Sequence, residues 1–246
     1  MKMGKLPDII IKENPRSLAH VCADIIASTA DASIKKKGSF AIAISGGSTP
    51  RPIHRLLARE PYISDIPWDK MHLFWVDERW VPYQDPASNY GTAKEDFLDM
   101  VPLGPTQIHR MPVETTPEDG AKQYQKDLID FFNIKGKRFP AFDLIILGIG
   151  KDGHTASLFP GQHALCEEEK MVMAIIGGDP FVYRLTLTLP VLNNAGKILF
   201  VVSGKGKSEI LSKVLTQRHI KLPAQLVKPV NNELTWLVDR AASSKL

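Results

Sequence analysis

The sequence has few cysteines and no long apolar run. Its two cysteines, Cys22 and Cys166, do not stand at a spacing typical of metal sites, so reduced thiols are expected in place of a disulfide framework. No run approaches the roughly 18 apolar residues of a membrane span, and the N-terminus has no apolar signal core. These absences predict a cytoplasmic protein without a membrane segment.

An excess of charge of one sign is also lacking. The formal net charge is only +4, and the lysines are dispersed apart from residues 35–37, a short run typical of a solvated helix end. We therefore expect no nucleic-acid partner, whereas a slightly basic protein suits a small anionic substrate. No repeat or low-complexity linker interrupts the chain, so residues 1–246 are predicted to form one domain, as a monomer or a weak homo-oligomer.

Apolar runs typical of buried strands alternate with helical patterns. The strand-like runs are residues 9–11, 40–44, 71–76, 142–147, 171–176, 184–189, 197–202 and 235–238. The helical patterns cover residues 15–30, 51–57, 87–100, 117–132 and 207–215. This alternation predicts a three-layer α/β/α fold, with a mostly parallel sheet and helices on both faces.

A glycine-rich turn follows the strand expected over residues 40–44. Backbone amides, the positive end of a helix dipole and hydroxyl groups converge in such a turn, which favours a bound phosphate. The lysine and the spacing of a Walker loop are absent, so a nucleoside triphosphate is not predicted. The alternative is a capped tight turn. The candidate phosphate-binding residues are Ser45, Gly46, Gly47, Ser48 and Thr49.

A second glycine-rich loop follows the strand expected over residues 142–147 and carries Asp152 and His154. Ligands in open α/β sheets bind at the carboxyl ends of strands, and histidine exchanges protons near neutral pH, so this loop is the best candidate for the active site. The alternative assigns His154 to the surface and makes Asp152 the N-cap of a short helix over residues 155–158.

The same loop matches the G-x-G-x-x-G spacing of dinucleotide sites through Gly148, Gly150 and Gly153. Pro160 and the acidic run at residues 167–169 nevertheless leave no place for the crossover helix and the second strand that a dinucleotide site requires. We therefore expect no dinucleotide cofactor.

A third strand-like run, residues 71–76, ends in Asp77, Glu78 and Arg79. Two carboxylates and a guanidinium at a strand end form either an ion-pair cluster that closes the loop or a group that binds a polar substrate. Because the carboxyl ends of parallel strands meet at one edge of a sheet, three polar strand ends together favour the substrate site.

These segments together resemble the 6-phosphogluconolactonase family over nearly the whole chain. The resemblance is carried by residues 45–50, 77–82 with 88–90, 148–160, 184–193, 202–207 and 223–224. The family is a relative of glucosamine-6-phosphate deaminases and ribose-5-phosphate isomerases, and the resemblance implies their α/β/α architecture. It also implies hydrolysis of 6-phospho-D-glucono-1,5-lactone to 6-phospho-D-gluconate, the second step of the oxidative pentose phosphate pathway.

The resemblance implies roles for individual residues. His154 would take the proton from the attacking water and return one to the departing ring oxygen, while Asp152 would orient the imidazole. Neither a metal ion nor another cofactor is expected. The residues expected to bind the substrate or its phosphate are Ser45, Gly46, Gly47, Ser48, Thr49, Asp77, Arg79, Arg184 and Lys207.

Several nearby side chains are expected to lie outside the site. Lys205 is interpreted as a solvated loop lysine. Arg51, in the first turn of a helix, could reach the anion, but a solvent-facing arginine is the expected alternative. The histidines at positions 54, 72, 109 and 163 are expected to be structural or on the surface.

Two other functions are compatible with parts of the pattern. A glucosamine-6-phosphate deaminase would share the phosphate turn, Asp77 and the Asp-Gly-His motif, but Arg79 and residues 155–160 depart from its usual loops. A sugar-phosphate sensor would use the fold only for binding, although such regulators normally carry a DNA-binding segment ahead of the domain. Fold alone does not separate these functions.

Overall fold

The computed structural model describes residues 8–217, 221–231 and 233–246. Its strands are β1 (Asp8–Lys12), β2 (Phe40–Ile44), β3 (Met71–Trp75), β4 (Asp77–Arg79), β5 (Ile108–His109), β6 (Leu144–Leu147), β7 (Val172–Gly177), β8 (Val182–Leu187), β9 (Ile198–Val202) and β10 (Leu234–Asp239). Its α-helices are α1 (Pro15–Lys37), α2 (Arg51–Leu57), α3 (Tyr62–Asp65), α4 (Asn89–Ala93), α5 (Pro117–Phe132), α6 (Leu189–Asn193), α7 (Ser208–Thr216) and α8 (Pro223–Leu226). Short 3₁₀ turns are η1 (Trp68–Lys70), η3 (Pro105–Gln107), η4 (His163–Cys166) and η5 (Lys205–Lys207), and η2 (Lys94–Leu98) is a π-helical turn.

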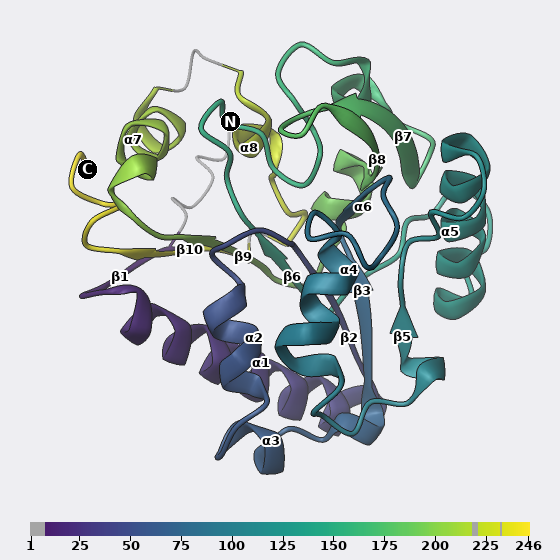
Figure 1. Ribbon diagram of the computed structural model, residues 1–246, viewed down its shortest axis with the longest axis horizontal. Helices are drawn as coiled ribbons and strands as arrows, with labels where there is room; N and C mark the ends of the chain where they lie inside the picture. The colour runs from purple at the N-terminus through teal and green to yellow at the C-terminus, as the bar shows by residue number, and fades with distance from the viewer. Residues whose placement is uncertain (1–7, 218–220, 232) are drawn as a thin grey trace.

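Within the described residues, seven strands form a parallel sheet in the order β1-β10-β9-β6-β2-β3-β5. Its central strands are buried on both faces, and their residues are apolar throughout, as in β2 and β9. Helices α1 and α2 cover one face, and α7 and α8 lie on the other (Figure 1). The predicted α/β/α fold is confirmed.

A second, three-stranded sheet has the order β4-β8-β7 and is antiparallel. The strand-like runs at residues 171–176 and 184–189 therefore do not join the parallel sheet. A short turn connects β7 and β8, and so short a connection allows a hairpin but no crossover to a parallel neighbour. Helix α5 packs against this hairpin, at one end of the main sheet (Figure 1).

Two predicted helices differ from the structure. The pattern over residues 87–100 becomes α4 followed by the π-helical turn η2, and helix α4 begins after Ser88, whose hydroxyl accepts a hydrogen bond from the Gly91 amide. Residues 155–158 form no helix. Thr155 and Leu158 instead pair across a tight turn, and Ala156 has a left-handed φ of 48°.

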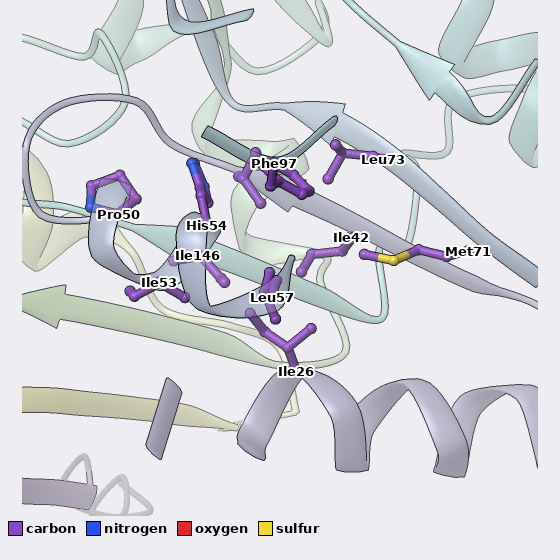
Figure 2. Close-up of a pocket in the computed structure, with 11 residues that line it drawn as sticks. Ile26, Ile42, Pro50, Ile53, His54, Leu57, Met71, Leu73, Phe97 and Ile146 are labelled. Atoms are coloured by element: carbon purple, nitrogen blue, oxygen red, sulfur yellow. The ribbon is translucent and has the colours of Figure 1, made fainter. Parts of the chain in front are cut away.

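A small apolar cavity lies between α1, α2 and the sheet (Figure 2). It measures about 10 Å³, space for about one water molecule, and His54 is the polar side chain on its wall. The His54 ring packs on Phe97 at 4.9 Å between centroids, and burial lowers the pKa of His54 to about 4. His54 is therefore a neutral core residue, in keeping with the structural role expected for it.

The two cysteines and the histidines at positions 72 and 109 lie outside the motifs described above. Cys22 is buried and Cys166 is exposed, and both are unpaired. His72 and His109 lie on adjacent strands with Nδ1 and Nε2 3.1 Å apart. In the described part of the chain, no helix is both long and apolar enough to span a membrane.

Candidate active site

A cleft of about 670 Å³ opens at the carboxyl ends of β2, β3, β6 and β9. These strands are neighbours in the parallel sheet, so the loops that follow them meet at one edge. Every residue predicted for the site lines this cleft: Ser45, Gly46, Gly47, Ser48, Thr49, Asp77, Arg79, Asp152, His154, Arg184 and Lys207.

The turn after β2 lines the cleft and has unused backbone amides. Among the described residues, no backbone N–H from Gly46 to Thr49 donates a hydrogen bond to the protein. Gly47 has φ of 95°, a conformation that favours glycine. The Ser45 hydroxyl donates to the Ile146 carbonyl at 2.8 Å, so it joins β2 to β6 and is not free to donate to an anion.

Position 46 has no room for a side chain, because Asn89 packs against it. A Cβ on Gly46 would lie 1.7 Å from Asn89 Oδ1, so only glycine lets this turn approach the asparagine. Asn89 Nδ2 donates to the Asp77 carbonyl at 2.8 Å, which fixes the amide orientation. Asn89 therefore connects the turn after β2 to the start of β4.

The Asp77 carboxylate is buried and held by hydrogen bonds. Its Oδ2 accepts from the Ser157 hydroxyl at 2.6 Å, and its Oδ1 accepts from Asn89 Nδ2 at 3.4 Å. Ser157 is itself fully buried and comes from the loop that carries His154. Asp77 thus occupies a defined position in the cleft wall.

Glu78 holds the start of helix α4 in place. Oε1 accepts from the Asn89 and Arg79 amides, each at 2.7 Å, and Oε2 accepts from the Tyr90 amide at 2.8 Å and the Ser88 hydroxyl at 3.1 Å. Burial raises the pKa of Glu78 to about 7, although the hydrogen bonds from the amides act in the opposite direction. Glu78 has a structural role, and in the described residues Asp77, Glu78 and Arg79 form no ion pair. The ion-pair alternative for this segment is therefore wrong.

Glu78→Gln should lower the free energy of unfolding by about 1 to 3 kcal/mol. The glutamine NH₂ group would face backbone N–H donors that now bind a carboxylate oxygen, which leaves buried donors without an acceptor. Urea unfolding monitored by circular dichroism measures the change. Glu95→Gln is the control, because the Glu95 side chain is 74% exposed. Equal stability of the two variants would contradict this role of Glu78.

The loop after β6 places an imidazole and a carboxylate together. Asp152 Oδ1 lies 2.5 Å from His154 Nδ1 and also accepts from the His154 amide at 3.1 Å. Because Nδ1 donates to the carboxylate, the neutral ring carries its lone pair on Nε2. Asp152 therefore orients the ring and is not the N-cap of a helix. The ring also packs on Phe159 at 4.6 Å between centroids.

Gly150 provides the space for this pair. A Cβ at position 150 would lie 2.0 Å from His154 Nδ1 and 2.7 Å from Asp152 Oδ1. The loop closes on itself through a bond of 2.8 Å from the Gly150 amide to the His154 carbonyl. Gly150 thus leaves room for the contact between His154 and Asp152.

Two arginines face each other on the antiparallel sheet. Arg79 of β4 and Arg184 of β8 are directly paired in the register. Arg184 is buried and donates to the carbonyls of Gly177 and Pro180, and burial followed by the charge of Arg79 lowers the pKa of Arg184. Like charges opposite each other in a sheet are destabilising, so this pair favours an anion between or beside the two guanidinium groups.

Two buried polar atoms in the cleft wall have no hydrogen-bond partner among the described residues: Arg79 Nε and Asn89 Oδ1. Buried polar groups are normally satisfied, so each exception needs an explanation, such as a functional role or a bound ion. Both residues line the cleft. This is the pattern of a site built to bind a polar molecule.

Lys207 is half-buried and lines the cleft from η5. Its ammonium donates to the Ile149 carbonyl at 2.7 Å, and burial followed by the charge of Lys151 lowers the pKa of Lys207. The neighbouring Lys205 is exposed and does not line the cleft, in agreement with its interpretation as a solvated lysine.

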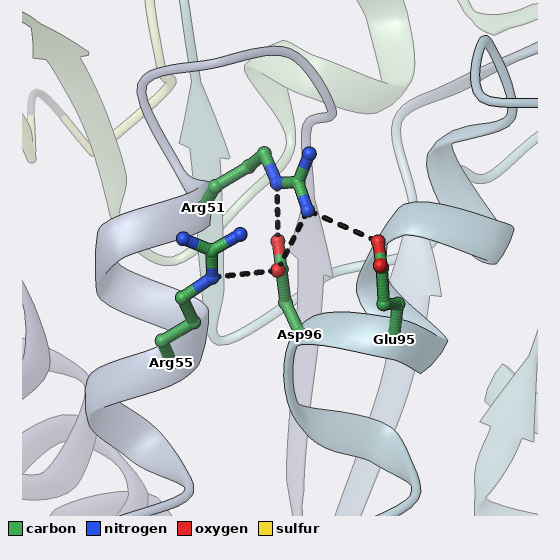
Figure 3. A network of polar contacts seen from close by, with 4 residues as sticks. All are labelled: Arg51, Arg55, Glu95 and Asp96. Atoms are coloured by element: carbon green, nitrogen blue, oxygen red, sulfur yellow. Dashed lines mark hydrogen bonds and ion pairs between the residues drawn. The ribbon is translucent and has the colours of Figure 1, made fainter.

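Arg51 does not line the cleft, as expected, and its side chain is 35% exposed. Figure 3 shows that Arg51 and Arg55 of α2 both bind the buried carboxylate of Asp96, and Arg51 also binds Glu95. These two carboxylate partners of Arg51 were not predicted from the sequence. The π-helical turn η2 brings Asp96 to these arginines, and the contact fixes α2, which follows the turn after β2.

Several cleft residues were not assigned by sequence reasoning: Asn89, Lys151, Phe159, Asp179 and Ser203. Lys151 stands between Gly150 and Asp152, so its position in the sequence could have indicated that it lies in the cleft. Asp179 lies in the turn between β7 and β8, which reaches the cleft only through the antiparallel pairing. Within the described residues, no group of three or more His, Cys, Asp or Glu side chains could hold a metal ion.

Comparison with known proteins identifies the family of the chain. Residues 13–236 match the family model described as glucosamine-6-phosphate isomerases/6-phosphogluconolactonase. The chain belongs to this family. It is 39% identical over 216 residues to the 6-phosphogluconolactonase of Synechocystis sp., with 87% of each sequence covered.

Solved structures of this family have the same fold. The chain superimposes on the 6-phosphogluconolactonase of Trypanosoma cruzi with a TM-score of 0.87 and 26% identity, covering 99% of each chain. A monomeric glucosamine-6-phosphate deaminase gives a TM-score of 0.82 at 21% identity, with 97% of this chain and all of that chain covered. The second likeness shows the fold alone.

Proposed function

We propose that this family member hydrolyses 6-phospho-D-glucono-1,5-lactone to 6-phospho-D-gluconate, with His154 as the base that activates water. The enzyme class, a lactone hydrolase, follows from curated relatives of similar length that are named 6-phosphogluconolactonase. The observation that carries the residue assignment is the bond of 2.5 Å between His154 Nδ1 and Asp152, which leaves Nε2 as the basic nitrogen beside the cleft.

The reaction requires two proton transfers. Nε2 takes a proton from water as the water oxygen attacks the lactone carbonyl carbon, and a tetrahedral oxyanion forms. Collapse of this intermediate breaks the bond to the ring oxygen, which receives the proton from the imidazolium. Asp152 stabilises the imidazolium between these steps. The proposal includes no metal ion, because a δ-lactone is already an activated ester.

The phosphate would bind across the turn after β2. In the described part of the chain, the amides of Gly46 to Thr49 have no acceptor, and the three cationic side chains predicted for the site line the same cleft. Arg79 and Arg184 come from the antiparallel sheet, whereas Lys207 follows β9. Asp77, held by Ser157 and Asn89, would accept a hydroxyl group of the sugar ring.

The proposal extends to the whole chain and its surroundings. Residues 1–246 would form one lactonase domain, located in the cytoplasm and acting as a monomer or weak homo-oligomer on a small phosphorylated lactone, with neither nucleic acid nor a membrane as partner.

A coupled assay distinguishes this function from that of the deaminases. Freshly generated lactone is supplied to the purified protein, spontaneous opening is subtracted, and ammonia release from glucosamine 6-phosphate is measured in parallel. We expect accelerated lactone opening and no ammonia. Ammonia release without accelerated opening would overturn the proposal.

Lys207→Ala should reduce the preference for the phosphorylated lactone over unphosphorylated gluconolactone by about 1.5 to 3 kcal/mol, the range of a hydrogen bond to a charged group. The ratio of kcat/KM for the two substrates measures the preference. Lys205→Ala should change little, since Lys205 is exposed outside the cleft. Unaltered selectivity in Lys207→Ala would exclude Lys207 from the phosphate site.

A further inference from the structure

Two lysines from neighbouring strand ends share the cleft. Lys151 belongs to the loop after β6, and Lys207 belongs to η5 after β9, which pairs directly with β6. On its other side β6 pairs with β2, whose turn carries the unused amides of Gly46 to Thr49. The loop that contains Lys151 therefore follows the strand between the two elements proposed to bind phosphate.

Neither lysine has an acidic partner to offset its charge. Within the described residues, no ion pair includes Lys151 or Lys207, although both line the cleft. The two charges are close enough for Lys151 to depress the pKa of Lys207, after burial as the main cause, and Asp152 acts in the opposite direction. Two gathered cations repel each other, and a bound dianion would relieve that repulsion.

The lysines are also linked to the imidazole. Lys207 Nζ donates to the Ile149 carbonyl, two residues before Lys151, and Lys151 directly precedes Asp152, the partner of His154. The segment from Ile149 to His154 is thus held at both ends: Lys207 binds the Ile149 carbonyl, and the Gly150 amide binds the His154 carbonyl. An anion bound by Lys151 would contact the same loop that presents Nε2.

We propose that Lys151 is a further phosphate-binding and positioning residue, which together with Lys207 binds the phosphate of the lactone and so fixes the loop that carries His154. This inference rests on the proposed function. It implies that the phosphate contributes to catalysis through the position of the imidazole as well as to binding.

Lys151→Gln tests the phosphate contact. We expect kcat/KM for the phosphorylated lactone to fall about 10- to 100-fold, as for the loss of a hydrogen bond to a charged group, and kcat/KM for unphosphorylated gluconolactone to stay within about twofold. Lys151→Arg should restore most of the loss, and Lys205→Gln is the matched control. An equal loss on both substrates, or no loss on either, would overturn the role of Lys151.

A separate dianion tests the positioning. Inorganic phosphite added to gluconolactone should accelerate hydrolysis by the wild type, and Lys151→Gln and Lys207→Gln should lose this activation. If Lys151 were merely structural, Lys151→Gln would keep the activation by phosphite. If phosphite did not activate the wild type at all, the positioning part of the proposal would be refuted.

Direct binding separates this inference from the proposed function. ³¹P NMR titration with inorganic phosphate should show weaker binding to Lys151→Gln than to the wild type, by about tenfold. If the wild type fails to open the phosphorylated lactone but this difference remains, the proposed function fails and the Lys151 site stands. Equal phosphate affinity in both proteins refutes the site regardless of activity.

Discussion

Replacement of His154 by asparagine should lower kcat by about 10² to 10⁴ and leave KM much less affected. Asparagine keeps the loop polar and has a similar size, but its side chain cannot take a proton from water. Steady-state kinetics with fresh lactone, after subtraction of the uncatalysed rate, measure both constants. The expected split arises because the base acts on the attacking water and does not hold the phosphate.

His163→Asn is the matched control for this substitution. His163 is exposed in η4 and does not line the cleft, so its replacement should leave kcat unchanged. A folded His154→Asn protein that works within a few-fold of wild type would refute the role of His154. Asp77 would then be the next base to test, because its carboxylate lies in the same cleft.

Gly150→Ala should lower kcat by about 10²-fold, because displacement of a catalytic group by about 1 Å is enough for such a loss. The new Cβ would lie 2.0 Å from His154 Nδ1, so the ring must leave its contact with Asp152. The His154 side chain is 30% exposed and can move outward. Thermal stability should therefore change much less than activity. Kinetics and thermal unfolding of the same preparation compare the two effects.

Gly206→Ala is the control for the added methyl group. Gly206 also follows a strand of the parallel sheet, but a Cβ there meets no atom within 4 Å and the residue does not line the cleft. Wild-type activity in Gly150→Ala would show that the observed position of the His154 ring is not the one used in catalysis.

The parallel sheet and its polar edge could be predicted from local patterns. Runs such as residues 40–44 and 142–147 are apolar throughout, which is typical of strands buried on both faces, and each ends in glycine and polar residues. Parallel strands bring their carboxyl ends to one edge, so motifs about 100 residues apart in sequence could be placed together. The cleft confirms that placement.

The antiparallel sheet could not be predicted in the same way. Strand β4 has only three residues, Asp77–Arg79, too few to show a period. The pairing of Arg79 with Arg184 follows from the register of β4 on β8, which depends on tertiary packing. For the same reason the contact of the turn between β7 and β8 with the cleft was missed.

Individual side chains show a similar limit. The bonds of Glu78 to the start of α4 and of Arg51 to Asp96 join segments that are 10 or more residues apart, and the sequence alone predicted neither partner. Asn89 was part of a recognised motif, yet its contact with Gly46 is visible only once the two turns are packed together. Spacing identifies the type of residue available, whereas packing decides its partner.

The pH dependence of kcat/KM in wild type and His154→Asn, measured side by side and corrected for spontaneous opening, tests the central claim most directly. A charged imidazolium cannot accept the proton of water, so wild-type activity should fall towards acid pH. The residual activity of His154→Asn should lack this acid limb. A variant that retains the same acid limb would contradict the assignment of His154 as the base.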